Sequence, residues 1–183
     1  MSVLNDRKIR EYISENKIKV TPSPEDIQYQ PSSLDLRLSN EVYKFLEDTE
    51  VIDSKHTKDY AYPTLFKELV LQSQEFVLCR TVEKVKLPNN ILGRVEGRSS
   101  IGRLGVAIHV TAGFIDPGFE GTITLEIVNL NNVPVVLYPN QRVCQIVFEE
   151  LCEPAEKPYG TEGRNKYQGQ ISVTPSRIYD DAE

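Results

Sequence analysis

Residues 122 to 129, which read TITLEIVN, carry the clearest signal for the fold. Positions 123, 125 and 127 carry isoleucine, leucine and isoleucine, whereas positions 122, 124 and 126 carry two threonines and a glutamate. Because neighbouring side chains of a strand point to opposite faces, this period of two predicts a strand with one apolar and one polar face. A glutamate on a strand is most often solvated. If the polar face instead lines a pocket, Glu126 becomes a carboxylate able to exchange protons near neutral pH.

Further runs of β-branched and aromatic residues flank this stretch, and turn residues separate them. Many short strands at close spacing indicate a mainly β fold, a distorted jelly roll or β-barrel, rather than alternating βαβ units. Upstream, Asn5 or Asp6 is placed to cap a short N-terminal helix that ends near Asn16. The expected strands cover residues 34–38, 42–45, 76–79, 81–87, 91–95, 106–110, 135–137 and 143–148.

The length of 183 residues suits one domain, 1–183, with residues 153–183 as a C-terminal tail. The tail carries glycines and prolines between Tyr159, Lys166 and Tyr167, a composition typical of a mobile lid that folds over a bound anion. A frayed terminus is the alternative. Residues 46–67 are charged and lack a clear period, so we expect an excursion outside the sheets.

The formal net charge of −6 disfavours a nucleic-acid partner, because binding to a phosphate backbone normally needs a basic face. No stretch approaches the length needed to span a membrane, so we expect no membrane partner. Three cysteines, Cys79, Cys144 and Cys152, show no CxxC spacing, and the chain opens without an apolar signal segment. These features predict a cytoplasmic protein whose cysteines are core thiols.

The densest polar signal is GRSSIGRLG at residues 97–105, directly after an expected strand. Its two guanidinium groups, two hydroxyls and glycines predict a cradle for a polyphosphate, because charge-assisted donors suit phosphate oxygens. The GxxxxGK[ST] spacing of a Walker loop is absent. Considered alone, such a segment is better explained as a solvated basic turn between strands.

A second polar segment, HVTAGFIDPGFEG at residues 109–121, is rich in turn residues and holds Asp116 among apolar neighbours. Aspartate before Pro-Gly commonly forms a turn. His109 stands between Ile108 and Val110, where we expect it to pack within a strand.

Taken together, these segments resemble the dCTP deaminases of the trimeric dUTPase superfamily. The matching motifs are RSSIGRLG, TAGFIDPGFEGTITLEIVN, NQRVCQIVFEEL and a tail with Tyr159, Lys166-Tyr167 and Gln170. The resemblance runs from about Pro31 to Gln170, with QPSSLDLR at residues 30–37 as the opening strand. It implies a dUTPase-like jelly roll, a homotrimer in which neighbouring subunits share each active site, and feedback inhibition by dTTP.

The resemblance also implies a role for each motif. Glu126 would be the catalytic acid and base that activates the water attacking C4 of cytosine, while Ser99 and Arg103 position that water and the base. Asp116 would take the deoxyribose 3′-hydroxyl, and the tail would close over the triphosphate, whose oxygens hold Mg²⁺ without protein ligands. The nucleotide-binding residues so implied are Arg98, Ser99, Ser100, Ile101, Gly102, Arg103, Asp116, Thr124, Leu125, Glu126, Gln145, Tyr159, Lys166 and Gln170.

Some family members stop at dUTP, whereas others also cleave it to dUMP and diphosphate. Family members with one activity tend to carry His-Arg after the Thr-Ala pair, and those with both carry Gly plus an aromatic residue. This chain has Gly113-Phe114, with phenylalanine where tryptophan is more usual. We therefore predict conversion of dCTP and two waters to dUMP, diphosphate and ammonia, with Asp116 orienting the second water.

Three alternatives stay open at this point: a deaminase that releases dUTP, a plain dUTPase, and a jelly-roll module that binds nucleotides or a protein without catalysis. Zinc deaminases use an HxE motif with PCxxC ligands. This chain has only His56 and His109 and no PCxxC, so we expect no zinc.

Overall fold

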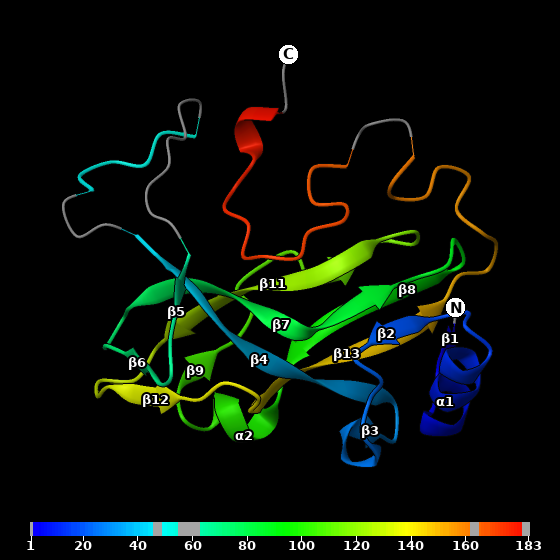
Figure 1. The fold of residues 1–183 in the computed structure, drawn as a ribbon, viewed down its shortest axis with the longest axis horizontal. Helices are drawn as coiled ribbons and strands as arrows, with labels where there is room; N and C mark the ends of the chain where they lie inside the picture. Colours follow the sequence, from blue (N-terminus) through cyan, green and yellow to red (C-terminus); the bar gives the residue numbers. More distant parts are fainter. Residues whose placement is uncertain (1, 46–48, 55–62, 162–164, 181–183) are drawn as a thin grey trace.

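The computed structural model describes residues 2–45, 49–54, 63–161 and 165–180 (Figure 1). Antiparallel strands dominate the described chain, and one nine-residue helix, α1, lies near the N-terminus. The mainly β class predicted from the sequence is confirmed. The strands are β1 (Ser2–Val3), β2 (Lys19–Thr21), β3 (Tyr29–Gln30), β4 (Ser33–Lys44), β5 (Thr64–Leu65), β6 (Leu69–Leu71), β7 (Phe76–Lys86), β8 (Ile91–Gly97), β9 (Val106–Ala107), β10 (Phe114–Ile115), β11 (Glu120–Asn129), β12 (Val135–Leu137) and β13 (Arg142–Glu150); the helices are α1 (Asp6–Ser14), α2 (Ser99–Gly102), η1 (Asp26–Gln28) and η2 (Ile178–Asp180).

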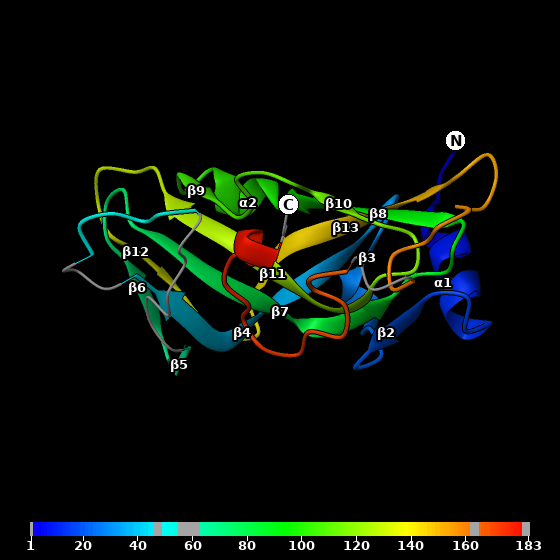
Figure 2. The same ribbon diagram turned by 90° about the horizontal axis from the view of Figure 1, so that it is seen from above.

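The main sheet has the order β10-β8-β13-β4-β7-β11-β9. Its long strand β4 belongs to both halves of the sheet, because its first half pairs with β13 and its second half with β7. The register with β7 shifts between Leu38 and Val42, where the strand bends. Figure 2 shows the resulting curl, with α1 at one end of the long axis and β6 and β12 at the other.

The expected helix is confirmed, since the Asn5 side chain accepts a hydrogen bond from the Lys8 amide at 2.9 Å and Ile9 and Tyr12 are buried. Several strand boundaries differ from the prediction. The pairs of runs at 34–38 with 42–45 and at 76–79 with 81–87 each form one strand, β4 and β7. The strand expected at 106–110 is only β9, because the chain leaves the sheet after Ala107.

Part of the expected excursion at 46–67 lies outside the described residues. At its end, however, β5 pairs with Glu41 and Val42 of β4, so this part belongs to the sheet.

The prediction of core thiols is confirmed for Cys79 and Cys144, and burial raises the pKa of the Cys79 thiol to about 12. It is wrong for Cys152, which is exposed. Within the described ranges, no helix is long and apolar enough to cross a membrane.

Leu34, Leu36 and Leu38 of β4 alternate with polar residues and are fully buried. Asp35, between two of these leucines, is also only 1% exposed, because side chains from neighbouring segments cover it. Its burial shows that both faces of this half of β4 are covered.

Leu36 provides a test of the core. We expect Leu36→Ala to lower the free energy of unfolding by about 2–5 kcal/mol, since it leaves a cavity in the middle of the sheet. Urea unfolding at one fixed protein concentration measures this loss. Ile27→Ala is the control, because the Ile27 side chain is exposed and its removal should cost less than about 0.5 kcal/mol. Equal losses in the two variants would contradict the assignment of the core.

Candidate active site

A cavity of about 560 Å³ lies between β11, the segment 109–119 and the C-terminal tail. Its lining is mainly apolar, with a few polar groups, as expected of a small-molecule site. Six residues predicted from the sequence line it: Phe114, Asp116, Thr124, Glu126, Tyr159 and Gln170. Phe45, Phe76 and Leu78 form part of its apolar wall. We refer to it as the Glu126 cavity.

The predicted alternation places Glu126 in this cavity. The side chains of Leu125 and Ile127 are buried and do not line the cavity, whereas that of Glu126 is 30% exposed. Ile123 departs from the predicted alternation, because it is buried but also lines the cavity, next to a register shift in β11. The Thr111 amide donates a hydrogen bond of 2.9 Å to Glu126 Oε2, and the Thr111 hydroxyl lies 3.5 Å from the same oxygen. Within the described chain, Oε1 makes no hydrogen bond. The carboxylate is therefore held through one oxygen and has the other available to a ligand or water.

His109 was predicted to pack within a strand, but it lies beyond the end of β9 and lines the Glu126 cavity. Its side chain is 16% exposed, and Nδ1 is 4.0 Å from Glu126 Oε2. Neither ring nitrogen has a hydrogen-bond partner among the described residues. No pattern in the sequence separated this histidine from a packing residue, because its position depends on where the chain leaves the sheet.

Asp116 lies in the turn that the Pro-Gly pair predicts, and its carbonyl accepts a hydrogen bond from the Phe119 amide at 3.1 Å. The turn needs Gly118, which has φ +90°, and a Cβ there would clash with Pro158 and Tyr159 of the tail. Asp116 lines both the Glu126 cavity and a second cavity of about 350 Å³. It therefore lies where the two cavities meet.

The tail folds back over the sheet at this turn. The Tyr159 amide donates to the Pro117 carbonyl at 2.7 Å, and burial raises the pKa of the Tyr159 phenol. Further along, Gln170 Nε2 donates to the Thr122 carbonyl at 2.6 Å, so this side chain serves to fasten the tail to β11. Lys166 is part of the tail but does not line the Glu126 cavity.

The Gly113-Phe114 pair precedes Asp116. The Gly113 carbonyl accepts a hydrogen bond from the Val95 amide at 2.8 Å, and a Cβ at this position would lie 3.1 Å from the Val95 carbonyl oxygen. Phe114 is 64% exposed and contributes its ring to the cavity wall. The small residue thus lets the loop approach β8, and the aromatic residue faces the cavity.

Thr124 lines the cavity, whereas the Leu125 side chain is fully buried on the other face, so only its backbone can contact a ligand. One edge of β11 pairs with β7 along most of its length. On the other edge β9 pairs only with Val128 and Asn129. The edge near Thr124 therefore carries backbone groups that a planar ligand can reach.

The segment 98–103 and Gln145 lie elsewhere. Ser99, Ser100, Gly102 and Arg103 are exposed in and after the short helix α2, and Ile101 is buried. Arg98 Nε is 3.1 Å from Asp35 Oδ2, which also contacts Arg142 Nη1 at 3.0 Å. Burial raises the pKa of Asp35 despite these two cations. Gln145 Oε1 accepts a hydrogen bond from the Ser33 hydroxyl at 2.9 Å.

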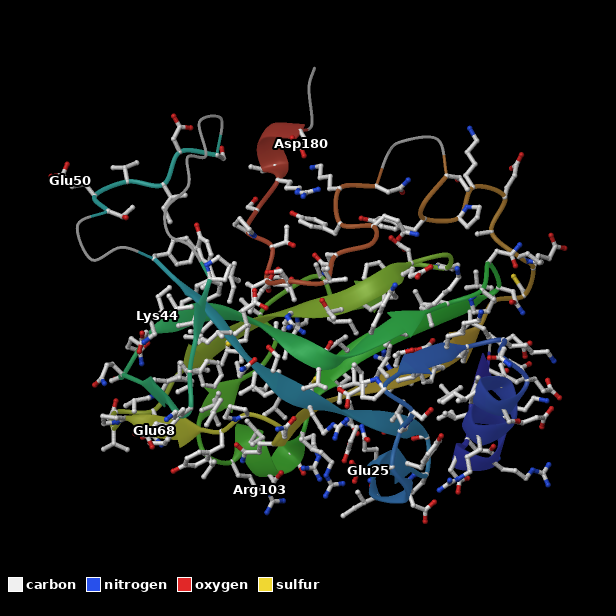
Figure 3. The ribbon with its side chains drawn as sticks, viewed as in Figure 1. Glu25, Lys44, Glu50, Glu68, Arg103 and Asp180 are labelled. Atoms are coloured by element: carbon white, nitrogen blue, oxygen red, sulfur yellow. The ribbon has the colours of Figure 1, made fainter. Side chains whose placement is uncertain are left out.

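We refer to residues 98–103 with Gln145 as the Arg98 cluster. Cys144, next to Gln145, pairs with Gly97, the residue directly before Arg98, which explains why the two segments come together. None of its residues lines the Glu126 cavity. Figure 3 shows Arg103 on one side of the sheet and the tail with Asp180 on the other. Within one chain, the predicted site residues therefore form two separate groups, one around the Glu126 cavity and the other in the Arg98 cluster.

In the ranges that the structure describes, no group of three His, Cys, Asp or Glu side chains could hold a metal ion. A metal bound through the oxygens of a polyphosphate would need no such group.

The curled antiparallel sheet and its cavity define a protein of the dUTPase-like fold. The dUTPase of Staphylococcus bacteriophage 80alpha is 16% identical and superposes with a TM-score of 0.51 over 84% of this chain and 94% of its own. The deoxycytidine triphosphate deaminase of Agrobacterium tumefaciens is 25% identical, with a TM-score of 0.66 over 81% of this chain and 48% of its own.

Within this fold, the chain belongs to the dCTP deaminase family. A family model described as dCTP deaminase-like matches residues 3–151. A protein of Methanosphaera stadtmanae named "dCTP deaminase, dUMP-forming" is 48% identical over 189 residues, which cover 99% of this chain and 96% of that protein. The resemblance seen in the sequence motifs is confirmed.

Proposed function

We propose that this protein is a dCTP deaminase that forms dUMP, releasing ammonia and diphosphate. The observation that carries the proposal is the Glu126 carboxylate, held by the Thr111 amide inside a cavity of about 560 Å³ on the polar face of β11. The full-length similarity to a relative named as a dUMP-forming dCTP deaminase supports the same activity.

Deamination needs a water deprotonated, N3 of the cytosine protonated and the 4-amino group expelled as ammonia. One carboxylate that takes and returns a proton can serve all three steps. Glu126 fits this role because Oε2 is held by Thr111 while Oε1 is available to the water. The open edge of β11 near Thr124 and Leu125 would hold the edge of the pyrimidine through backbone groups.

Phosphate binding falls to the Arg98 cluster. It exposes two hydroxyls, from Ser99 and Ser100, and the Arg103 guanidinium, and Gln145 lies at its edge. Because this cluster is separate from the Glu126 cavity within one chain, we propose a homotrimer in which the cluster of one subunit completes the cavity of its neighbour. Ser99 and Arg103 would then position the water and the base beside the neighbour's Glu126.

Cleavage of the α-phosphate bond of dUTP requires a second water in line with the leaving diphosphate. Asp116 is suited both to the 3′-hydroxyl and to this water, since it lies where the two cavities meet. Mg²⁺ held by the triphosphate would offset the charge of the leaving group. Gly113 and Phe114 would distinguish this enzyme from those that stop at dUTP, because they shape the wall next to Asp116.

The C-terminal tail is the remaining part of the proposed nucleotide site. Tyr159, Gln170 and Lys166 belong to a C-terminal lid, residues 153–183, of one dUTPase-like domain, and we propose that this lid closes over the triphosphate. We also propose feedback inhibition by dTTP, which shares the deoxyribose and triphosphate of the substrate, and a cytoplasmic location.

Product analysis tests the proposed reaction. Pure protein incubated with dCTP and Mg²⁺ should yield dUMP, diphosphate and ammonia in equal amounts, resolved by ion-exchange chromatography and an ammonia assay. Accumulation of dUTP without dUMP would contradict the second step, and absence of ammonia would contradict deamination. Incubation with dUTP is the control, because a protein that only hydrolyses dUTP would release dUMP from it but no ammonia from dCTP.

A further inference from the structure

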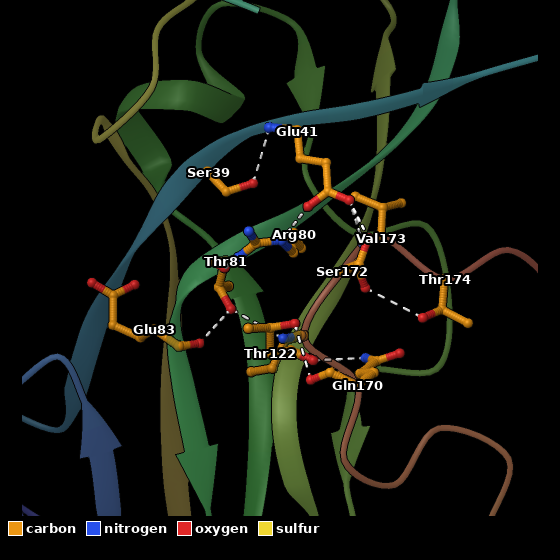
Figure 4. A network of polar contacts seen from close by, with 11 residues as sticks. Ser39, Glu41, Arg80, Thr81, Glu83, Thr122, Gln170, Ser172, Val173 and Thr174 are labelled. Carbon is orange, nitrogen blue, oxygen red and sulfur yellow. Dashed lines mark hydrogen bonds and ion pairs between the residues drawn. The ribbon is translucent and has the colours of Figure 1, made fainter. Parts of the chain in front are cut away.

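A buried carboxylate outside the proposed catalytic set contacts the tail. Glu41 lies on β4, and its side chain is only 10% exposed. Figure 4 shows that its Oε1 accepts hydrogen bonds from the Ser172 hydroxyl and from the Val173 amide, the latter at 3.1 Å. Its Oε2 accepts a hydrogen bond from Arg80 Nε of β7 at 2.6 Å. Two residues 131 and 132 positions away along the chain are thus bound to one carboxylate.

The energetics of this contact favour a specific attachment. A buried charge is costly unless it is paired and hydrogen-bonded, and here both oxygens of Glu41 are engaged. Burial acts to raise the pKa of Glu41, but the hydrogen bonds from the tail and from Arg80 outweigh it and lower the pKa. Hydrogen bonds to an ionised acceptor are the stronger kind. The tail is therefore held by a charged group that the sheet itself orients through Arg80.

Apolar packing fixes the same point of the tail. Val173 is 4% exposed and packs with Tyr43 and Leu78 of the sheet and with Phe45. On one side of it, the Thr122 amide donates to the Gln170 carbonyl at 2.9 Å. On the other side, residues 174–176 line the Glu126 cavity. The contact with Glu41 thus lies directly before residues 174–176, which form one part of the cavity wall.

We infer that Glu41 is a positioning residue, which holds residues 172–173 on the sheet so that residues 174–176 form a wall of the nucleotide site before any nucleotide binds. The inference rests on the proposed function for the identity of the ligand. Glu41 does not line the cavity and acts only through the tail. A wall that is already in place spares the ligand the entropy cost of ordering it. The apparent affinity for nucleotide is therefore the intrinsic affinity multiplied by the fraction of chains in which the wall is in place.

This role has a kinetic signature. When the attachment is weakened, nucleotide must first select the minority of chains with the tail in place, which raises KM. At saturating nucleotide the tail is again in place and kcat is unchanged. A residue that only stabilised the sheet would lower the melting temperature without separating KM from kcat.

Two variants and one control test the inference. Glu41→Gln removes the charge at nearly constant shape, and Ser172→Ala removes one tail contact while leaving the Glu41–Arg80 pair inside the sheet. Ser172→Ala therefore remains informative if the loss of the buried charge impairs folding. Glu149→Gln is the matched control, because Glu149 is also a strand carboxylate paired with an arginine, Arg94, at 3.2 Å, and its side chain is 16% exposed.

The first measurement is amide hydrogen exchange of the nucleotide-free protein. We expect Val173 and its neighbours in 169–176 to exchange about tenfold faster or more in Glu41→Gln, as for loss of a hydrogen bond to a charged group, and less strongly faster in Ser172→Ala. The control should match the wild type. Unchanged exchange in both tail variants would overturn the inference.

The second measurement is steady-state turnover of dCTP with Mg²⁺. We expect KM to rise in Glu41→Gln by the reciprocal of the fraction of chains that keep the wall in place, about tenfold where about one chain in ten keeps it, with kcat within about twofold of the wild type. An unchanged KM in a variant whose exchange shows the wall released in most chains would overturn the positioning role. If the wild type does not turn over dCTP, the proposed function fails but the inference can still be decided: calorimetric titration with dCTP then replaces KM, and equal affinity of wild type and Glu41→Gln would overturn it.

Discussion

Ammonia release from dCTP is expected to fall by about 10²–10⁴-fold in Glu126→Gln, because the amide cannot take a proton from the attacking water or return it to the base. The substitution keeps the side-chain shape and the acceptor for the Thr111 amide, which lies 2.9 Å from Oε2. dCTP binding should therefore remain, and the loss should appear in kcat rather than KM. Single-turnover ammonia release and calorimetric titration with dCTP measure the two quantities separately.

The control for this experiment is again Glu149→Gln, which removes a strand carboxylate outside the Glu126 cavity and should keep full activity. Retention of deaminase activity in Glu126→Gln would contradict the assignment of the acid and base. His109 would then be the first group to test, since its Nδ1 lies 4.0 Å from the same carboxylate and neither of its ring nitrogens is bonded within the described chain.

Mixing two inactive variants is expected to restore activity. Glu126→Gln lacks the proposed acid and base, and Arg103→Ala lacks a cation of the Arg98 cluster, which does not line the Glu126 cavity of its own chain. If each site takes Glu126 from one subunit and Arg103 from the next around a three-fold ring, a random mixture in equal amounts regains about a quarter of the wild-type specific activity. Co-expression with two affinity tags, followed by a dCTP turnover assay, measures the recovery.

A second mixture sharpens this test. Wild-type chains combined equally with chains that carry both substitutions should retain about a quarter of the activity if sites are shared, but about half if each subunit contains its own site. No recovery in the first mixture together with half activity in the second would contradict shared sites. Sedimentation of the wild-type protein checks the trimer independently of turnover.

Much of the fold could be predicted because its signals are local. The alternation in residues 122–129 correctly placed Glu126 on the face opposite Leu125, and Asn5 correctly marked the start of α1. Strand ends were less accurate, as with β9, because the residues after Ala107 have β-forming side chains but no neighbouring strand to pair with. The site residues near Asp116 and Glu126 could be named because their motifs are contiguous in the chain.

Sequence pattern was sufficient for the mainly β class, the approximate places of the long strands, the opposite faces of Leu125 and Glu126, and the family, since period and motif are properties of neighbouring residues. The burial of Asp35 between Arg98 and Arg142, the separation of the Arg98 cluster from the Glu126 cavity, and the attachment of the tail to Glu41 became visible only in the folded chain. These contacts join segments up to 132 residues apart, and the curl of the sheet, not any local pattern, brings such segments together.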